Sequence, residues 1–272
     1  MNVFNIAIRE VKIGFRNPWA YSFIALFSLF SLSLLLINAQ NFVQGYSSGT
    51  SMMLNFILYL LPLMSLLLGS FSLTAEKEEG SWQLLSTYPI STFSFILGKY
   101  LGLIIVMLTI VAFGYGITGV IGAITGKGLE YKAFGLFFAF SVGLVLLFIA
   151  IALGIGTVSR NRWQALTLGV AIWFFAIIGW PTLLIAVLGL MPYLWIKPVL
   201  IGLTFLNPAE LVRLFVVVKL GGGSALGPEY YEWVRWIGRP AGTWIFLGIC
   251  LTWMTLATGL ATLIWERGRS RG

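Results

Sequence analysis

The stretch MMLNFILYLLPLMSLLLGSFSL (residues 52–73) contains no charged side chain. A bilayer core of about 30 Å needs roughly 20 apolar residues in helical form, so this stretch is long enough to cross a membrane once. Five further stretches are nearly as free of charge. The six predicted spans are Trp19–Ile37, Met52–Leu73, Phe93–Ile124, Ala133–Val158, Trp163–Leu190 and Thr243–Trp265. Because irregular backbone is costly in hydrocarbon, we expect a continuous helix in each span.

The composition of the chain excludes a soluble domain. Of its 272 residues, 59% are hydrophobic and 10% are charged, whereas a typical soluble domain has about 25% charged residues. The sequence therefore predicts an all-α integral membrane protein with six transmembrane helices. The net charge of +8 is typical of basic loops that face anionic lipid, and we expect no nucleic-acid partner. Within the apolar chain, the spacing of Gly98 and Gly102 is typical of close helix packing.

Several classes of chemistry are excluded by missing residue types. The chain has no His, no Asp and a single Cys, Cys250. This rules out the usual zinc sites, Ser-His-Asp and Cys-His catalysis, and an internal disulfide. All nine Glu residues lie outside the predicted spans, so no proton relay is visible, and GAITGKG (residues 122–128) has the wrong spacing for a phosphate-binding loop. We expect no enzyme, metal or cofactor in this chain, and a partner has to supply energy.

The first 18 residues form an amphipathic pattern. Polar side chains recur on one narrow face of a helix, and apolar side chains occupy the opposite side. The polar set is Asn5, Arg9, Lys12 and Arg16, and the apolar set is Phe4, Ala7, Ile8, Val11 and Phe15. This pattern predicts a helix that lies in the membrane interface and ends at Asn17-Pro18. A cytoplasmic helix that rests on another subunit is the alternative.

The distribution of basic residues predicts the orientation of the chain. If the N-terminus is inside, the first outer loop, Asn38 to Ser51, carries no charge, and the short inner segments are rich in Arg and Lys. A bias of this kind places both termini in the cytoplasm. Residues 74–91 are then a cytoplasmic loop, and residues 191–242 lie outside the cell. Prolines interrupt this outer segment, so we expect short interfacial or re-entrant helices there.

The cytoplasmic loop TAEKEEGSWQLLSTYPIS (residues 74–91) combines acidic and aromatic side chains. A short helix capped by Ser81 would carry Trp82, Leu85 and Tyr88 on similar sides. Such a cluster is costly in a free loop and fits as a plug in a partner's groove, with the acids fixing its register. In the alternative interpretation, Trp82 and Tyr88 anchor at lipid headgroups and the acids form a solvated cap.

This loop resembles the signature of the ABC-2 family of ATP-binding-cassette permeases, an acidic and glycine-containing pattern after the second span. The residues that form it here are Glu76, Lys77, Glu78, Glu79, Gly80, Ser81, Trp82, Leu84, Leu85, Tyr88 and Pro89. The resemblance implies one ABC-2 transmembrane domain over residues 1–272 of a multi-pass cell-membrane protein. It also implies a homodimer of permeases, each with a cytoplasmic ATPase subunit that binds ATP and Mg and is coupled through residues 74–91. Residues 1–18, with Arg9, Lys12 and Arg16, would be the interfacial elbow of the family.

Within the family, the chain is similar to permeases of transporters that mature the copper sites of nitrous-oxide reductase. The stretches that carry this likeness are EEGSWQLLSTYPIS (78–91), IAIREVKIGFRNPW (6–19) and LNPAELVRL (206–214). The likeness implies a periplasmic or extracellular copper-binding partner on the outer face and a permease that transmits movement without passing metal. Its docking residues would be Asn207, Pro208, Glu210 and Arg213. Two alternatives stay open: an ABC-2 exporter of lipid, drug, peptide or ion, and a membrane scaffold without an ATPase.

Overall fold

The computed structural model describes residues 3–38, 47–80, 91–126 and 131–269, with side chains at all of these positions except 34–38 and 268–269. Regular structure within these residues is helical throughout. The elements in chain order are α1 (Val3–Arg16), α2 (Pro18–Asn38), α3 (Ser48–Glu78), α5 (Thr92–Thr125), α6 (Tyr131–Val158), α7 (Arg162–Phe174), η1 (Phe175–Gly179), α8 (Trp180–Gly189), α9 (Tyr193–Leu206), α10 (Pro208–Lys219), η2 (Gly222–Leu226), η3 (Pro228–Tyr230), α11 (Tyr231–Gly238) and α12 (Pro240–Arg269).

The predicted spans lie within these helices. Among the described residues, five helical segments are long and apolar enough to cross a membrane, namely α3, α5, α6, the stretch α7–η1–α8 and α12. A sixth is added if the pair α9–α10, which is bent by 109°, is taken as one span. The first predicted span lies in α2, which is 21 residues long. The all-helical class and the multi-span architecture are confirmed, whereas the orientation of the termini stays a prediction.

Helix α6 lies at the centre of the bundle and packs against both α3 and α12, while α1 and α2 pack against α5. Small residues bring α3 and α6 close together. A Cβ on Gly69 would lie 2.5 Å from the Cβ of Ala152, and a Cβ on Gly156 would lie 2.8 Å from the Cβ of Leu73. Contacts this short leave no room for larger side chains, so the two helix backbones approach closely along their length.

The fifth predicted span is not a continuous α-helix. The π-helical turn η1 separates α7 from α8 and ends two residues before Pro181, which lies in the first turn of α8. Proline has no N–H group, and its ring crowds the carbonyl four residues earlier, so the helix rearranges here. The Ala176 carbonyl in this turn accepts a hydrogen bond from Asn207 Nδ2 at 2.6 Å. The irregular turn is therefore fastened to the corner between α9 and α10.

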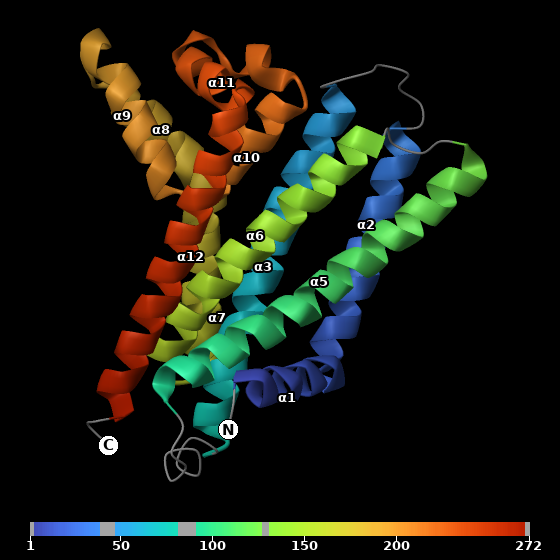
Figure 1. Cartoon of the computed structure of the whole chain (residues 1–272), viewed down its shortest axis with the longest axis vertical. Helices are drawn as coiled ribbons and strands as arrows, with labels where there is room; N and C mark the ends of the chain where they lie inside the picture. Colours follow the sequence, from blue (N-terminus) through green and yellow to red (C-terminus); the bar gives the residue numbers. More distant parts are fainter. Residues whose placement is uncertain (1–2, 39–46, 81–90, 127–130, 270–272) are drawn as a thin grey trace.

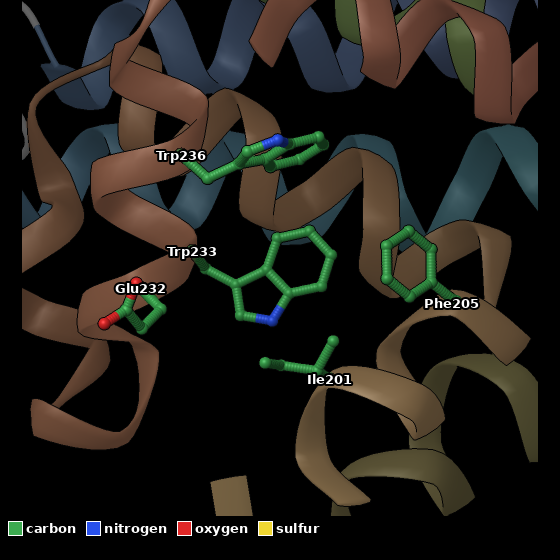
Figure 2. A pocket seen from close by; sticks show the side chains of 5 residues that line it. All are labelled: Ile201, Phe205, Glu232, Trp233 and Trp236. Carbon is green, nitrogen blue, oxygen red and sulfur yellow. The ribbon is translucent and has the colours of Figure 1, made fainter. Parts of the chain in front are cut away.

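The bundle has two distinct ends. Figure 1 shows α1 and the carboxyl end of α12 at one end, and α9 and α11 at the opposite end. The short helices predicted between the last two spans are present as α9, α10 and α11, while their location at the interface stays a prediction. Gly221 (φ 86°) and Gly227 (φ 90°) adopt left-handed conformations that let the chain turn between α10 and α11. A pocket of about 240 Å³ lies between α9 and α11 (Figure 2).

Candidate functional site

The charged turn, defined as Glu76, Lys77, Glu78 and Glu79, forms the last turn of α3 and its C-cap. The helix stops here because Gly80 takes a left-handed conformation (φ 68°) that glycine adopts without strain. The charged turn lies at the α1 end of the bundle and leads into the loop predicted to contact a partner. Successive residues on a helix are about 100° apart, so the four side chains extend in different directions.

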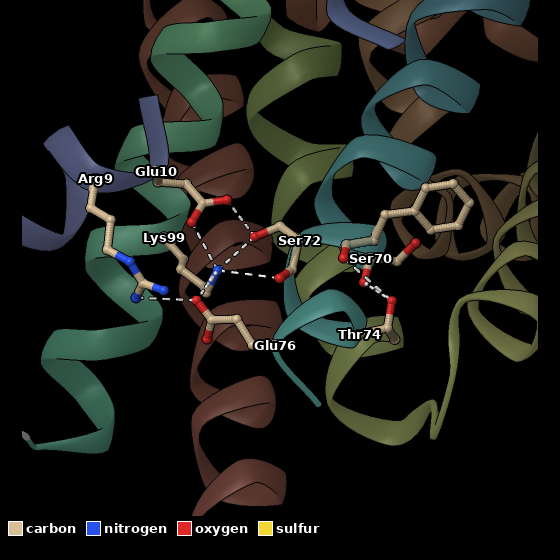
Figure 3. Close-up of polar contacts among 8 residues, drawn as sticks. Arg9, Glu10, Ser70, Ser72, Thr74, Glu76 and Lys99 are labelled. Atoms are coloured by element: carbon tan, nitrogen blue, oxygen red, sulfur yellow. Dashed lines mark hydrogen bonds and ion pairs between the residues drawn. The ribbon is translucent and has the colours of Figure 1, made fainter. Parts of the chain in front are cut away.

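Glu76 points into the protein and meets two cations. Its carboxylate Oε1 lies 3.1 Å from Lys99 Nζ on α5 and 3.3 Å from Arg9 Nη1 on α1. Both contacts are ion pairs, since neither oxygen of this enclosed carboxylate has an aligned hydrogen bond to any residue that the structure describes. Figure 3 shows the two basic side chains approaching Glu76 from different helices. The end of α3 is therefore joined to α1 and to α5 at the same point.

Arg9, Glu10, Glu76 and Lys99 form a buried cluster of charged groups. Lys99 lies at its centre and is only 1% exposed. Its Nζ donates to Glu10 Oε2 at 2.8 Å and to Ser72 Oγ at 2.7 Å. The Ser72 hydroxyl in turn donates to Glu10 Oε1, and the Ser72 carbonyl oxygen lies 3.3 Å from the ammonium (Figure 3). The lysine charge is thus surrounded by acceptors from α1 and α3.

The cluster is electrically balanced, because Arg9 and Lys99 carry two positive charges and Glu10 and Glu76 two negative ones. Removing an ion from water costs several kcal/mol, and close opposite charges and hydrogen bonds have to offset that cost. The four groups come from α1, α3 and α5, and none of the three helices could keep its buried charge if the others moved away. Charge pairing therefore fixes these three helices to one another.

The glycine pair predicted to allow close packing seats α1 against α5. A Cβ on Gly98 would lie 2.6 Å from the Cβ of Ile6. A Cβ on Gly102 would lie 2.5 Å from the Cβ of Glu10 and 2.8 Å from the carbonyl oxygen of Ala7. Any larger residue at these positions would push the helices apart. The two glycines thereby bring Glu10 within reach of the lysine that lies between them.

Helix α1 has three faces, of which the sequence pattern distinguished two. A third face packs on the bundle, and its buried residues are Ile6, Ala7, Glu10 and Gly14. On the predicted polar face, Lys12 and Arg16 are exposed and Arg9 is half-buried. On the predicted apolar face, Phe4 and Ile8 are exposed. The other members of the predicted apolar set face the bundle, since Ala7 is buried and Val11 and Phe15 pack against its core. The interfacial location of α1 stays a prediction.

Lys77 extends from the charged turn toward α6 and α12. Its Nζ donates to the carbonyl oxygens of Gly156, Thr157 and Ser159 at 2.9, 2.7 and 2.7 Å. These carbonyls lie at the carboxyl end of α6, where unpaired backbone oxygens and the helix dipole favour a cation. The ammonium also lies 5.1 Å from the ring centre of Trp265 on α12, in a cation–π contact.

Glu78 and Glu79 hold the start of α7. Glu78 Oε1 accepts a hydrogen bond from the backbone N–H of Arg162 at 2.8 Å, and its Oε2 lies 3.0 Å from Arg162 Nε. Glu79 Oε1 lies 3.3 Å from Arg162 Nη2. Acidic groups are favoured at the amino end of a helix, where backbone N–H groups are unpaired. These side chains are partly exposed, so solvent weakens their pairing.

Only the first residues of the predicted contact with a partner are among those that the structure describes. Glu76 to Gly80 lie within the described residues. The rest of the predicted contact set lies outside them and comprises Ser81, Trp82, Leu84, Leu85, Tyr88 and Pro89. Glu76 is buried against Lys99 and cannot also reach a partner. Glu78 and Glu79 remain partly exposed, and a role for them in aligning a partner stays a prediction.

The residues predicted to dock an outer partner form the corner between α9 and α10. Asn207 caps α10 by accepting from the Ala209 N–H at 2.9 Å, and Pro208 begins the helix. Glu210 accepts from Arg213 Nε at 2.9 Å. Asn207, Pro208 and Glu210 are enclosed by this chain and hold the corner together. Docking of a partner at this segment stays a prediction.

The sequence pattern does not single out Glu10, Ser72 or Lys99, although they complete the buried cluster. A local signal for one of them exists. Lys99 is the only charged residue in the predicted third span, and glycines lie on both sides of it at close spacing. A charge within a span indicates a buried partner, because it is too costly to face lipid.

A family of membrane transporter proteins matches almost the whole chain. The sequence profile described as "ABC-2 family transporter protein" matches residues 4–268. The chain belongs to the ABC-2 family. A "Probable ABC transporter permease protein NosY" of Stutzerimonas stutzeri is 29% identical over 234 residues, which cover 83% of this chain and 85% of the relative. A protein of the same name from Pseudomonas aeruginosa is 30% identical over 231 residues, which cover 82% of this chain and 83% of the relative.

Membership of the ABC-2 family, together with several apolar helices, makes the chain a multi-pass protein of the inner membrane. It is a permease subunit of an ABC transporter, and such a permease implies an ATPase partner. In an ABC permease the charged turn is a candidate functional site, since it connects the loop that resembles the family signature to the helices of the permease.

Proposed function

We propose that the charged turn passes the movement of a partner ATPase to the helices of this permease. The observation that carries the proposal is that three consecutive side chains bind three different sets of helices. Glu76 binds α1 and α5, Lys77 binds α6 and α12, and Glu78 binds α7. A displacement of this one turn is therefore shared by five other helices.

The loop after the charged turn is the proposed point of contact with the ATPase. ATP and Mg bind to the partner subunit, which hydrolyses ATP, and its closure acts on residues 81–90. Gly80 connects this loop to α3, and Ser91 begins α5 by accepting from the Ser94 N–H at 3.2 Å. The two helices that flank the loop are the same two that Glu76 and Lys99 join. Force on the loop would thus reach a pair of helices already fastened together.

For the cellular role, we infer maturation of the copper sites of nitrous-oxide reductase. The support is the likeness of sequence described above and the similarity to two permeases named NosY. In this role the permease passes movement to a copper-binding partner on the outer face and does not pass metal. The adjacent methionines Met52 and Met53 do not form a pair of ligands, since Met53 is buried and Met52 is exposed. An ABC-2 exporter of lipid, drug, peptide or ion is the alternative.

Two sets of substitutions separate ATPase contact from transmission of movement. Trp82→Ala with Leu85→Ala removes the predicted plug, and we expect the ATPase subunit to be lost on co-purification. Lys77→Met keeps the plug and removes the bonds to α6. For this variant we expect the ATPase subunit to stay bound while an ATP-dependent change in distance between spin labels at Ser48 and Tyr193 disappears.

The matched control is Lys132→Met, because Lys132 is exposed in the first turn of α6. Both labels are introduced as cysteines in a Cys250→Ala background, which removes the native thiol. A Lys77→Met protein with an unchanged ATP-dependent distance would disprove transmission through the charged turn. A double variant that retains its ATPase would disprove the contact.

A further inference from the structure

The pocket between α9 and α11 is lined almost entirely by apolar side chains. Its lining residues are Ile201 and Phe205 from α9 and Glu232, Trp233 and Trp236 from α11 (Figure 2). Its volume of about 240 Å³ lies below the range of roughly 300–1,000 Å³ that is typical of sites for drug-sized molecules. The pocket therefore fits a segment of an apolar chain.

One polar group in the pocket wall has no partner. Trp233 is 4% exposed, and its indole N–H donates to no acceptor among the described residues. Buried tryptophans normally find one, as Trp253 does with the Phe205 carbonyl oxygen at 2.9 Å. The Trp233 ring packs 5.1 Å from the ring centre of Phe205, and Figure 2 shows its nitrogen on the ring edge nearest Ile201. An acceptor that enters between these residues would satisfy the N–H group.

The surroundings of the pocket are apolar as well. The hairpin of α8 and α9 exposes large apolar side chains on its outer side, and the most exposed are Leu190 (88%), Tyr193 (88%) and Leu194 (86%). Helix α9 carries one charged residue, Lys197, whose Nζ lies 3.2 Å from Glu232 Oε1 in the pocket wall. An apolar and aromatic surface with a cation at its edge is typical of contact with a membrane interface.

We propose that this pocket holds one acyl chain of a membrane phospholipid. The chain lies between Ile201 of α9 and the tryptophans of α11, and a lipid ester carbonyl accepts the hydrogen bond from the Trp233 N–H. The phosphate lies beside Lys197, whose ammonium has three donors and uses one for Glu232. A bound chain would fill the space between α9 and α11 and hold the two helices at a fixed separation.

The test uses the full-length permease in nanodiscs that contain phosphatidylglycerol with a photoreactive diazirine in one acyl chain. After irradiation, mass spectrometry maps the labelled peptides, and we expect label on α9 and α11. Ile201→Trp fills the pocket, so label on these peptides should fall by roughly tenfold because an overfilled site excludes its occupant. The matched control is Leu251→Trp, which adds the same ring at an exposed position of α12 and should leave the label unchanged.

Two gentler changes test the polar contacts. Trp233→Phe keeps a ring and removes the N–H, and we expect lipid retention to weaken roughly 2- to 10-fold, as for loss of one hydrogen bond. A diacylglycerol probe without phosphate should label less than phosphatidylglycerol, and Lys197→Ala should abolish that difference. Equal label in the natural protein and in Ile201→Trp would overturn the proposal. Absence of label from α9 and α11, as when a partner protein fills the pocket, would overturn it too.

Discussion

The two ends of the bundle are held together in different ways. At the α1 end, charged groups join residues far apart in the sequence, as Glu10 and Lys99 do at 2.8 Å. At the α11 end, a partly buried pair joins Glu210 to Arg213, three positions later in the same helix, and the pair that links two helices, Lys197 with Glu232, is exposed to solvent. The helices near that second end are also interrupted, by the π turn η1 and by the 109° bend between α9 and α10.

This difference indicates where the molecule resists movement and where it permits movement. Directional pairs between distant helices hold those helices in one arrangement, whereas changes of shape concentrate at a few residues where elements end. We therefore expect the α1 end to move as one body and the α11 end to bend.

The assignment of the two ends to the two sides of the membrane has an all-or-none test. Ser48 and Gly80 flank α3 at opposite ends of the bundle, and both are exposed. In a Cys250→Ala background in intact cells, we expect Ser48→Cys to react with an impermeant maleimide and Gly80→Cys to react only after permeabilisation. Reaction of Gly80→Cys in intact cells would invert the orientation.

Loss of the central lysine tests the rigidity of the α1 end. Lys99→Met leaves Glu10 and Glu76 buried beside a single remaining cation, and we expect the free energy of unfolding to fall by about 3–5 kcal/mol. Unfolding in mixed micelles with a denaturing detergent measures the change. Lys132→Met, at an exposed lysine, should change it by less than about 0.5 kcal/mol. Equal stability of the two variants would contradict the proposed role of the buried cluster.

Two glycines of α5 form a matched pair of substitution sites that tests how closely α1 packs against α5. Gly102→Ala places a Cβ against Glu10 and the Ala7 backbone, and we expect a loss of about 1–3 kcal/mol in unfolding free energy from overpacking. A Cβ at Gly116 meets no atom of the described residues within 4 Å. Gly116→Ala should therefore be neutral or stabilise by up to about 1 kcal/mol through helix propensity. A similar loss in both variants would show that α1 is not closely seated.

The exposed ion pairs at the two ends should each contribute little to the free energy of unfolding, and by similar amounts. Arg162→Ala removes the side-chain pairs with Glu78 and Glu79, and Lys197→Ala removes the pair with Glu232. Solvent screens both sites, so each change in unfolding free energy should stay below about 1 kcal/mol. The change in unfolding free energy that each variant causes should be smaller still in high salt. An effect of either variant as large as that of Lys99→Met would remove the contrast between buried and exposed pairs.

The helices and the multi-span class could be predicted from sequence because they depend on local composition. A long apolar stretch has few alternatives to a helix in hydrocarbon, whatever its neighbours are. The close packing at Gly98 and Gly102 was also visible as a local spacing. Its partner was not, since no local pattern specifies that Ile6 and Glu10 of α1 lie against these glycines.

The buried cluster depends on contacts that no local pattern contains. Glu10, Ser72 and Lys99 meet only after three helices have packed together. The amphipathic pattern of residues 1–18 separates polar from apolar side chains, and Glu10 belongs to neither of its two stripes. For the same reason Glu76, read with its neighbours as part of an acidic loop, is found inside the protein.

The π turn in the fifth span shows a different kind of difficulty. Pro181 is visible in the sequence as a residue that can interrupt a helix, but prolines are also accommodated within uninterrupted helices, as Pro62 is in α3. Which outcome occurs depends on whether neighbouring groups satisfy the disturbed backbone. At η1 the amide of Asn207 supplies such a contact from 31 positions further along the chain. Tertiary structure therefore determines the local break.

The balanced set of Arg9, Glu10, Glu76 and Lys99 also bears on how the chain is made. Translation delivers residues in sequence order, so both acids leave the ribosome before Lys99 does. Until α5 has been synthesised, the two carboxylates have only Arg9 within their set to offset them. The four charges of this set balance only when α5 arrives, so we expect the first three spans to insert into the membrane jointly.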